Sequence, residues 1–157
     1  MSTQIEDLWP EKINTKIKTI APVTILRQQA SLLGKKTKNL VEGQVETKTV
    51  KDASQEKQLE HSFYLVAPAL DFYKYPLFRV QHGIMNWYPL KIFVDVIDSK
   101  NFKEKKRDVQ DMKRRIRLRA LALGIETEEE YLRKLKEIFA SEETQKAIES
   151  LIAQSRA

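Results

Sequence analysis

The sequence predicts an α+β domain: a four-stranded antiparallel sheet with one helix before it and two or three after it, the helices packed on one face. Three observations predict this class. Apolar residues recur at helical spacing after residue 21 and again after residue 108, and they alternate or run continuously between residues 40 and 96. The connections between the alternating segments are short, which favours antiparallel pairing. With 157 residues, 41% of them apolar, one domain over residues 1–157 is expected to have its own core.

The chain is expected to begin with an irregular arm and a helix. Residues 1–21 mix charges with scattered apolar side chains, and we expect Trp9 to hold this arm against the domain. A helix is predicted over residues 22–36. Pro22 suits its first position, which has no use for the missing N–H, and Gly34 with the lysines after it suits its end.

Four strands are predicted next, over residues 40–50, 61–68, 77–82 and 88–96. The first has one mildly apolar and one charged face, the second is almost continuously apolar, and the last alternates. Between them, residues 51–60 are mostly polar and residues 71–76 contain turn-forming types, so both segments are expected to be loops.

The last third, residues 100–157, is predicted to be helical. A first helix ends near residue 123, with Gly124 as its C-terminal cap. Thr127 and Glu130 have the spacing of a capping box that starts a second helix, and Ser141 starts a third.

Positive charge is concentrated in residues 100–119. This segment has ten basic and three acidic residues, a net charge of +7, whereas the whole chain carries +6. A basic helix of this kind can bind nucleic acid or an acidic protein, or can simply be a solvated face. The basic residues expected to contact such a partner are Lys103, Lys105, Lys106, Arg107, Lys113, Arg114, Arg115, Arg117 and Arg119.

Aromatic residues are concentrated as well, with nine of the thirteen between residues 63 and 93. Some belong in a sheet core, but a turn cannot easily bury three rings in residues 71–76. Tyrosine, tryptophan and arginine contribute much of the energy of protein interfaces, so an interface and a core are about equally good interpretations. The predicted partner-binding residues are Phe72, Tyr73, Tyr75, Arg79, Trp87 and Tyr88.

Candidates for catalysis are few. His61 and His82, with Asp71, Tyr73 and Arg79, could form an acid–base site of the kind found in small ribonuclease toxins, but no spacing rule supports it. Ordinary strand-end histidines are the better interpretation. The sequence contains no phosphate-binding glycine motif, no HExxH and no cysteine. No catalytic residue, cofactor or metal site is therefore predicted.

Two segments, PVTILRQQASLLG at residues 22–34 and FYLVAPAL at residues 63–70, resemble a group of small bacterial proteins with no assigned activity. The resemblance implies a bacterial cytoplasmic origin and nothing about residues 100–119. A cytoplasmic location also fits the absence of cysteine, of an apolar run of about 20 residues and of a secretory signal.

The leading functional hypothesis is a non-enzymatic interaction module that binds a partner protein, or a second copy of itself, through the aromatic loop and a sheet edge. The alternatives are nucleic-acid binding through residues 100–119 and a small ribonuclease-like toxin. No membrane partner is expected.

Overall fold

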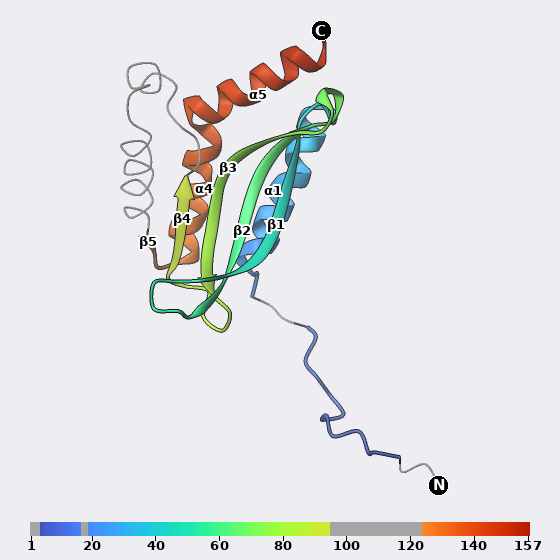
Figure 1. Ribbon diagram of the computed structural model, residues 1–157, viewed down its shortest axis with the longest axis vertical. Coiled ribbons are helices and arrows are strands. Elements are labelled where there is room, and N and C mark those ends of the chain that lie inside the picture. The colour runs from blue at the N-terminus through green and yellow to red at the C-terminus, as the bar shows by residue number, and fades with distance from the viewer. Residues whose placement is uncertain (1–3, 17–18, 95–123) are drawn as a thin grey trace.

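A computed structural model of the chain describes residues 4–16, 19–94 and 124–157 (Figure 1). The elements are α1 (Pro22–Lys36), β1 (Glu42–Lys51), β2 (Lys57–Ala67), the 3-10 turn η1 (Pro68–Leu70), β3 (Tyr73–Gly83), β4 (Leu90–Val94), β5 (Gly124–Ile125), α4 (Glu128–Ala140) and α5 (Glu142–Ser155). The predicted α+β class is confirmed, with a helix before an antiparallel sheet and two helices after it. The predicted helix ending near residue 123 lies outside the described residues.

The strands form one antiparallel meander in the order β1-β2-β3-β4-β5. Strand β2 pairs along its length with β1 and β3, so His61 lies between Thr47 and Val80. The register shifts after Phe63, where Tyr64 faces Pro76. A proline has no N–H for the ladder, and this irregularity is a position where a strand tolerates one.

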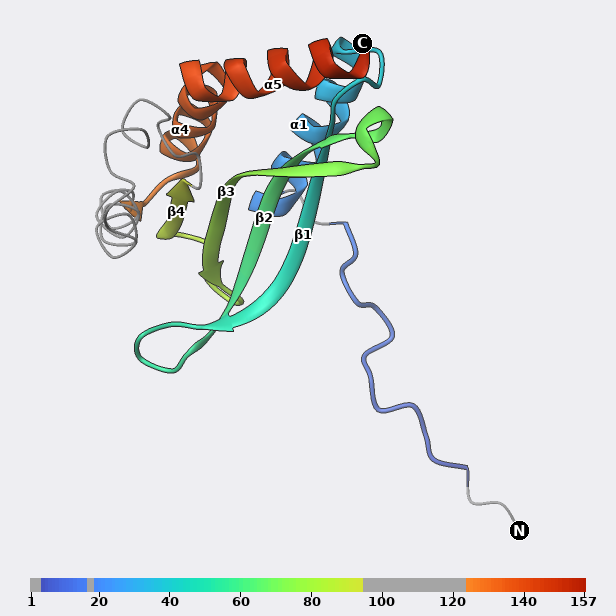
Figure 2. The same cartoon turned by 45° about the horizontal axis from the view of Figure 1, so that its top comes forward.

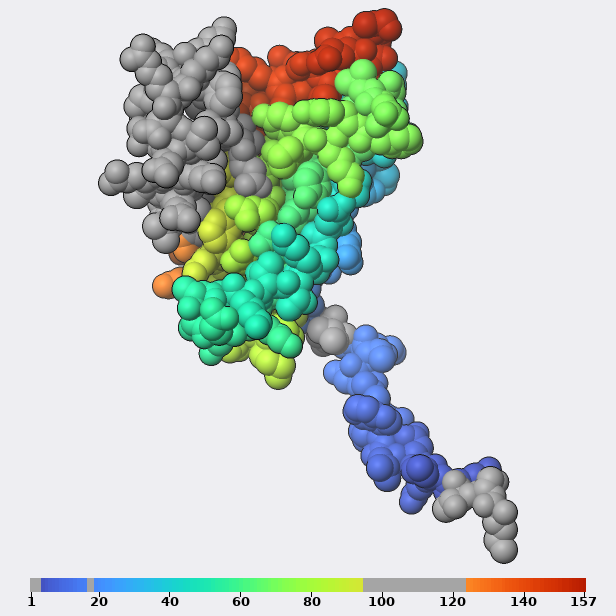
Figure 3. Space-filling model, in the orientation of Figure 1, coloured from blue at the N-terminus to red at the C-terminus, as the bar shows by residue number. Residues whose placement is uncertain are grey.

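The helices cover one face of the sheet. Figures 1 and 2 show α1 and α4 behind the strands, with α5 across the upper end. The other face, towards the viewer in Figure 1, is called the open face, and Figure 3 shows it in space-filling form. Because side chains alternate along a strand, every second strand residue faces the helices. The buried core consists of Ile25, Leu26, Ala30, Val41, Phe63, Leu65, Ala67, Leu77, Phe78, Val80, Leu90, Ile92, Ile125, Tyr131, Leu135, Ile138 and Leu151.

Local signals position the last two helices. The Thr127 hydroxyl accepts a hydrogen bond from the Glu130 N–H at 3.2 Å, and Ser141 Oγ accepts one from the Thr144 N–H at 3.3 Å. Both predicted helix starts are confirmed. The Tyr131 hydroxyl donates to the Pro22 carbonyl at 3.0 Å and so ties α4 to the start of α1. Burial in this contact raises the pKa of Tyr131.

Three details of the prediction are wrong. Residues 57–60 belong to β2 and residues 73–76 to β3, although both stretches were expected to be loops. Hydrogen bonding to the neighbouring strands stabilises these residues as strands, although their polar or turn-forming composition favours loops. Gly124 forms β5 with Ile125 instead of capping a helix, because it pairs with Lys91 of β4.

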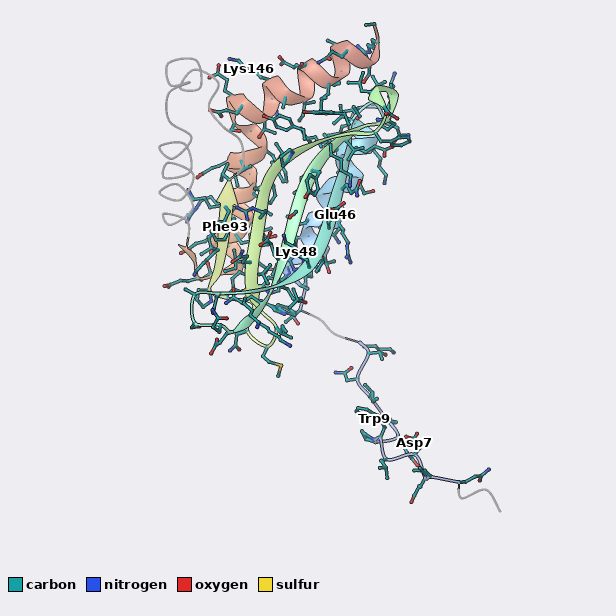
Figure 4. The ribbon with its side chains drawn as sticks, in the orientation of Figure 1. Asp7, Trp9, Glu46, Lys48, Phe93 and Lys146 are labelled. Carbon is teal, nitrogen blue, oxygen red and sulfur yellow. The ribbon has the colours of Figure 1, made fainter. Side chains whose placement is uncertain are left out.

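The arm does not lie against the domain as expected. Trp9 is 74% exposed, and Figure 4 shows it, with Asp7, on a segment that extends away from the sheet and helices. All residues from 4 to 16 are exposed. Within the described part of the chain, no helix has both the length and the apolar character that crossing a bilayer requires.

Candidate functional site

The first feature of interest is the edge of the sheet formed by β1. This strand has ten residues and, among the described strands, it pairs with β2 only. Its backbone groups on the other side are therefore available to an additional strand. The edge is long, and most of its second half is exposed, so it offers several consecutive rungs to a binding partner.

A groove of about 560 Å³ runs between this edge and α1. Its helix wall includes the small residues Ala30, Ser31 and Gly34, and its strand wall includes Gly43 and Val45. Charged side chains border the same groove: Arg27, Lys35 and Glu42. The groove has room for the apolar side chains of an added strand, and its own charged groups lie near its rim.

Gly43 allows α1 to lie close to β1. A Cβ atom at this position would be 2.5 Å from Ala30 Cα, 2.6 Å from Ala30 Cβ and 3.0 Å from Phe63 Cζ. Two of these atoms are closer than a methyl group tolerates, and Ala30 Cα belongs to the backbone. The groove thus depends on a glycine in the strand and on small residues in the helix, a combination that the sequence analysis missed. An isolated glycine within a strand pattern was the available signal.

Gly43→Ala is therefore expected to lower the free energy of unfolding by about 1–3 kcal/mol, because α1 must move away from the sheet. Urea denaturation followed by circular dichroism measures this change. Gly124→Ala is the matched control, since a Cβ atom there meets nothing within 4 Å. Equal losses in the two variants would contradict the close approach at Gly43.

On the open face, a buried carboxylate joins the first three strands. Glu60 of β2 is 2% exposed, and its Oε2 accepts a hydrogen bond from Gln81 Nε2 at 2.7 Å. Its Oε1 lies 3.8 Å from Lys48 Nζ and 3.7 Å from Arg79 Nη1, without a hydrogen bond among the described residues. These groups compensate the charge across β1, β2 and β3, and Figure 4 shows Lys48 on this face.

The aromatic turn, residues 71–73, lies at the end of the sheet where β1 begins. The register places Glu42 of β1 opposite Val66, and Val66 opposite Lys74. Asp71 and Phe72 have left-handed backbone conformations, with φ of 57° and 55°. Such values are uncommon for residues other than glycine and occur mostly in turns, and they are costly for a residue as bulky as Phe72.

This turn exposes two of the predicted rings. Phe72 is 67% exposed and Tyr73 54%, whereas Tyr75 is half-buried and packs against the core. Burial, with a smaller contribution from Tyr73, raises the pKa of Tyr75. Lys74, between these two tyrosines in sequence, donates from Nζ to Glu46 Oε1 at 2.6 Å and so connects the turn to β1.

The other predicted partner-binding residues lie elsewhere. Trp87 and Tyr88 follow β3, at the opposite end of that strand from Phe72. The Tyr88 ring packs edge-on to Tyr131 at 6.4 Å between centroids, and burial raises the Tyr88 pKa to about 12. Arg79 lies midway along β3, over the Phe93 ring at 5.1 Å. The structure thus brings together Phe72, Tyr73 and the β1 edge, but not all six residues.

The two histidines do lie together, on the helix-facing side of the sheet. Nε2 of His61 is 2.8 Å from Nε2 of His82, Nδ1 of His61 is 2.8 Å from the Thr47 hydroxyl, and Nδ1 of His82 is 2.9 Å from the Gly83 carbonyl. A carbonyl only accepts, so His82 carries its proton on Nδ1 and accepts from His61 Nε2–H at its own Nε2. The Thr47 hydroxyl then donates to His61.

This arrangement does not form the acid–base site considered from the sequence. Both imidazoles are buried, and each of their ring nitrogens has a hydrogen-bond partner. Arg79 points to the opposite face, where it lies near Glu60, and Asp71 and Tyr73 lie at the far end of the strands. The pair has the environment of a structural polar contact within the core.

The described residues contain no group of three or more His, Cys, Asp or Glu side chains that could hold a metal ion. The nine basic residues predicted to contact an acidic partner, from Lys103 to Arg119, lie outside the described residues. No protein-family model matches the chain, no curated protein is significantly similar to it, and no solved structure matches it.

Proposed function

We propose that this protein is a non-enzymatic interaction module that binds an extended segment of a partner protein along the β1 edge. The observation that carries the proposal is the combination of an edge strand of ten residues with a groove of about 560 Å³ beside it. Proteins that add a peptide strand to a sheet gain affinity from main-chain hydrogen bonds and specificity from pockets for alternate side chains. The β1 edge supplies the main-chain hydrogen-bonding groups, and the α1–β1 groove supplies a pocket for side chains.

The aromatic turn supports the same site. Phe72 and Tyr73 lie on the strand-to-strand connection next to the start of β1, and their exposed rings are of the type that dominates protein interfaces. A segment bound along the first half of β1 would end beside them. Phe72 has a left-handed backbone conformation and is 67% exposed, so a partner can reach its ring.

A peptide-display selection on the purified full-length protein, at a concentration where it sediments as a monomer, tests the proposal. Selected peptides are expected to protect the backbone amides of Gln44 to Thr49 from hydrogen exchange. Replacing Phe72 and Tyr73 together by Ser is expected to weaken peptide binding about tenfold, since two rings at the end of the site are lost.

The matched control is the double replacement of Ile84 and Met85 by Ser. These two side chains are also exposed and apolar, but they lie after β3, at the opposite end of the sheet. The control is expected to bind as the wild type does. Selected peptides that protect only other parts of the chain, or that bind both double variants equally, would contradict the proposal.

A further inference from the structure

The arm carries apolar side chains that are left in water. Ile5, Leu8, Trp9 and Ile13 are all exposed, and Ile13, the least exposed of the four, is still 61% exposed. Within the described residues, the arm's hydrogen bonds are local, from Trp9 N–H to Asp7 Oδ1 and from Lys16 N–H to Asn14 Oδ1, both 3.1 Å. Exposed apolar residues gathered on one segment indicate an interaction site.

The sequence of the arm has the pattern of a strand. From residue 12 to residue 19 it reads KINTKIKT, in which every odd position is β-branched and every even position is lysine or asparagine. Strict alternation with β-branched residues predicts a strand with one face suited to burial. The described part of this pattern, residues 12–16, pairs with no strand of the sheet.

The β1 edge is complementary to this pattern. On β1, Gly43 and Val45 face α1 and line the groove, while Glu46 lies on the open face, as Figure 4 shows. When the arm is added as a strand beside β1 with its odd positions facing α1, as the odd positions of β1 do, Ile13 and Thr15 lie in the groove. Its even positions then lie on the open face.

Charge favours the same pairing. The even positions of the arm include Lys12 and Lys16, and Glu46 is an even position of β1 on the open face, whereas Glu42 lines the groove. Opposite charges on neighbouring strands stabilise pairing.

The arm cannot reach the β1 edge of its own molecule in an antiparallel direction. Helix α1 has 15 residues and is therefore about 22 Å long. An antiparallel strand would end near Glu42, beside the C-terminal end of α1, whereas the chain must start α1 at Pro22. Only Ile20 and Ala21 separate the end of the pattern from Pro22, and that connection spans at most about 10 Å.

A parallel strand within one molecule is unfavourable for another reason. Figure 1 shows β1 at the right-hand edge of the sheet, running downward, with α1 behind the sheet and running upward. A strand to the right of β1, followed by α1 and then β1, would make a left-handed crossover. Such connections are right-handed in about 98% of cases.

We infer that the arm of one molecule adds as a strand to β1 of a second copy, by reciprocal exchange, and so forms a dimer. This inference rests on the proposed function, because it names the partner that fills the β1 edge. A two-fold axis relates the copies, so each gives one arm and receives one. In the free monomer the arm is exposed, so its backbone is available to pair with a strand of another molecule.

Sedimentation of the full-length protein over a range of concentrations tests the dimer. The wild type is expected to dimerise, and Ile13→Asp and Thr15→Pro are each expected to raise the dimer dissociation constant at least about tenfold. The first places a charge in the groove, and the second removes a ladder N–H. Both residues are exposed in the monomer, so unchanged thermal unfolding of the monomer would exclude misfolding.

Ser31→Phe tests the groove from the other side, because Ser31 is an exposed residue that lines it. A phenyl ring there is expected to weaken the dimer by a similar factor. The matched controls are Ile5→Asp, outside the alternating pattern, and Gln28→Phe, an exposed position of α1 that does not line the groove. Both controls are expected to dimerise as the wild type does.

A wild type that stays monomeric at the highest concentration tested would overturn arm exchange, as would a dimer that none of these three variants weakens. Neither result affects the peptide-selection test of the proposed function. Conversely, the Thr15→Pro variant has a β1 edge free of the arm at concentrations where it sediments as a monomer. Failure of this monomer to bind any selected peptide at β1 would remove the proposed function, while the sedimentation result would still stand.

Discussion

Phe63→Ala is expected to lower the free energy of unfolding by about 3–5 kcal/mol, the largest effect we expect from one substitution in this protein. Phe63 lies in the middle of β2 and is 1% exposed. Its ring stacks on Phe78 of β3 at 5.3 Å and packs against Phe139 of α4 at 5.4 Å. Truncation removes both ring contacts and leaves a cavity where sheet and helix meet.

The cavity is also next to the proposed binding site. A Cβ atom on Gly43 would be 3.0 Å from the Phe63 ring, so the ring supports the floor of the α1–β1 contact. Collapse of the cavity would therefore move α1 relative to the β1 edge. Peptide binding at β1 is expected to weaken in this variant even where the protein remains folded.

Urea denaturation followed by far-ultraviolet circular dichroism measures the change in stability. Phe72→Ala is the matched control, because the same side chain is deleted at a position that is mostly in water. The control is expected to stay within about 0.5 kcal/mol of the wild type. A loss below about 1 kcal/mol for Phe63→Ala would contradict the position of this ring in the core.

The helices were predictable because their signals are local. Pro22, Thr127 and Ser141 each act within one turn of chain, and the structure uses all three where the sequence placed them. Alternation identified β1 for the same reason. The fold class followed from the order of these segments, since a helix, a run of strands and further helices leave few ways to cover one sheet face.

The strand ends were not predictable from local sequence. Glu60 belongs to a polar stretch that suits a loop, but β2 continues through it because Lys48 and Arg79 on neighbouring strands compensate its charge and Gln81 donates a hydrogen bond to it. Likewise Pro76 lies in β3 because the register shifts opposite it. Both outcomes depend on residues more than ten positions away, which a pattern along one segment does not contain.

The candidate site was predictable only in part. The difficulty of burying consecutive aromatics in a turn indicated that rings in residues 71–76 could be exposed, but not which ones: Phe72 and Tyr73 are exposed, whereas Tyr75 is half-buried. The groove did not, because it arises where Gly43 of one element meets Ala30 of another. Trp87 was placed with the same surface because it is near in sequence, but β3 extends for eleven residues and separates it from the turn.

Acidification from about pH 7 to about pH 4 is expected to lower the free energy of unfolding by about 3 kcal/mol through His61 alone. The pKa of His61 falls from 6.5 to about 4, mainly because burial disfavours the charged ring, and further because of His82 and Arg27; Glu60 opposes the shift. Between about pH 6.5 and pH 4, the His61 side chain is protonated in the unfolded chain but stays neutral in the folded protein. Stability therefore decreases as the pH falls from 6.5 to about 4.

The groups around His61 explain why this side chain is hard to protonate in the folded protein. In the hydrogen-bond pattern described above, His61 donates from Nε2, so a proton added to this ring goes to Nδ1, the atom that accepts from the Thr47 hydroxyl at 2.8 Å. The Thr47 hydroxyl and the Gly83 carbonyl already use the Nδ1 atoms. Protonation of His61 therefore requires the Thr47 hydroxyl to change from donor to acceptor, and it places a charged ring at a position that is 1% exposed.

Urea denaturation at a series of pH values, for the wild type and for His61→Gln, isolates this contribution. Glutamine can still donate to His82 but does not titrate, so the variant is expected to lose about 3 kcal/mol less than the wild type between pH 6.5 and 4. Asp52, whose pKa is lowered mainly by a hydrogen bond from Ser54, and the other carboxylates titrate in both proteins and cancel in the difference. Parallel pH profiles for the two proteins would show that the histidine pair is not what destabilises the fold in acid.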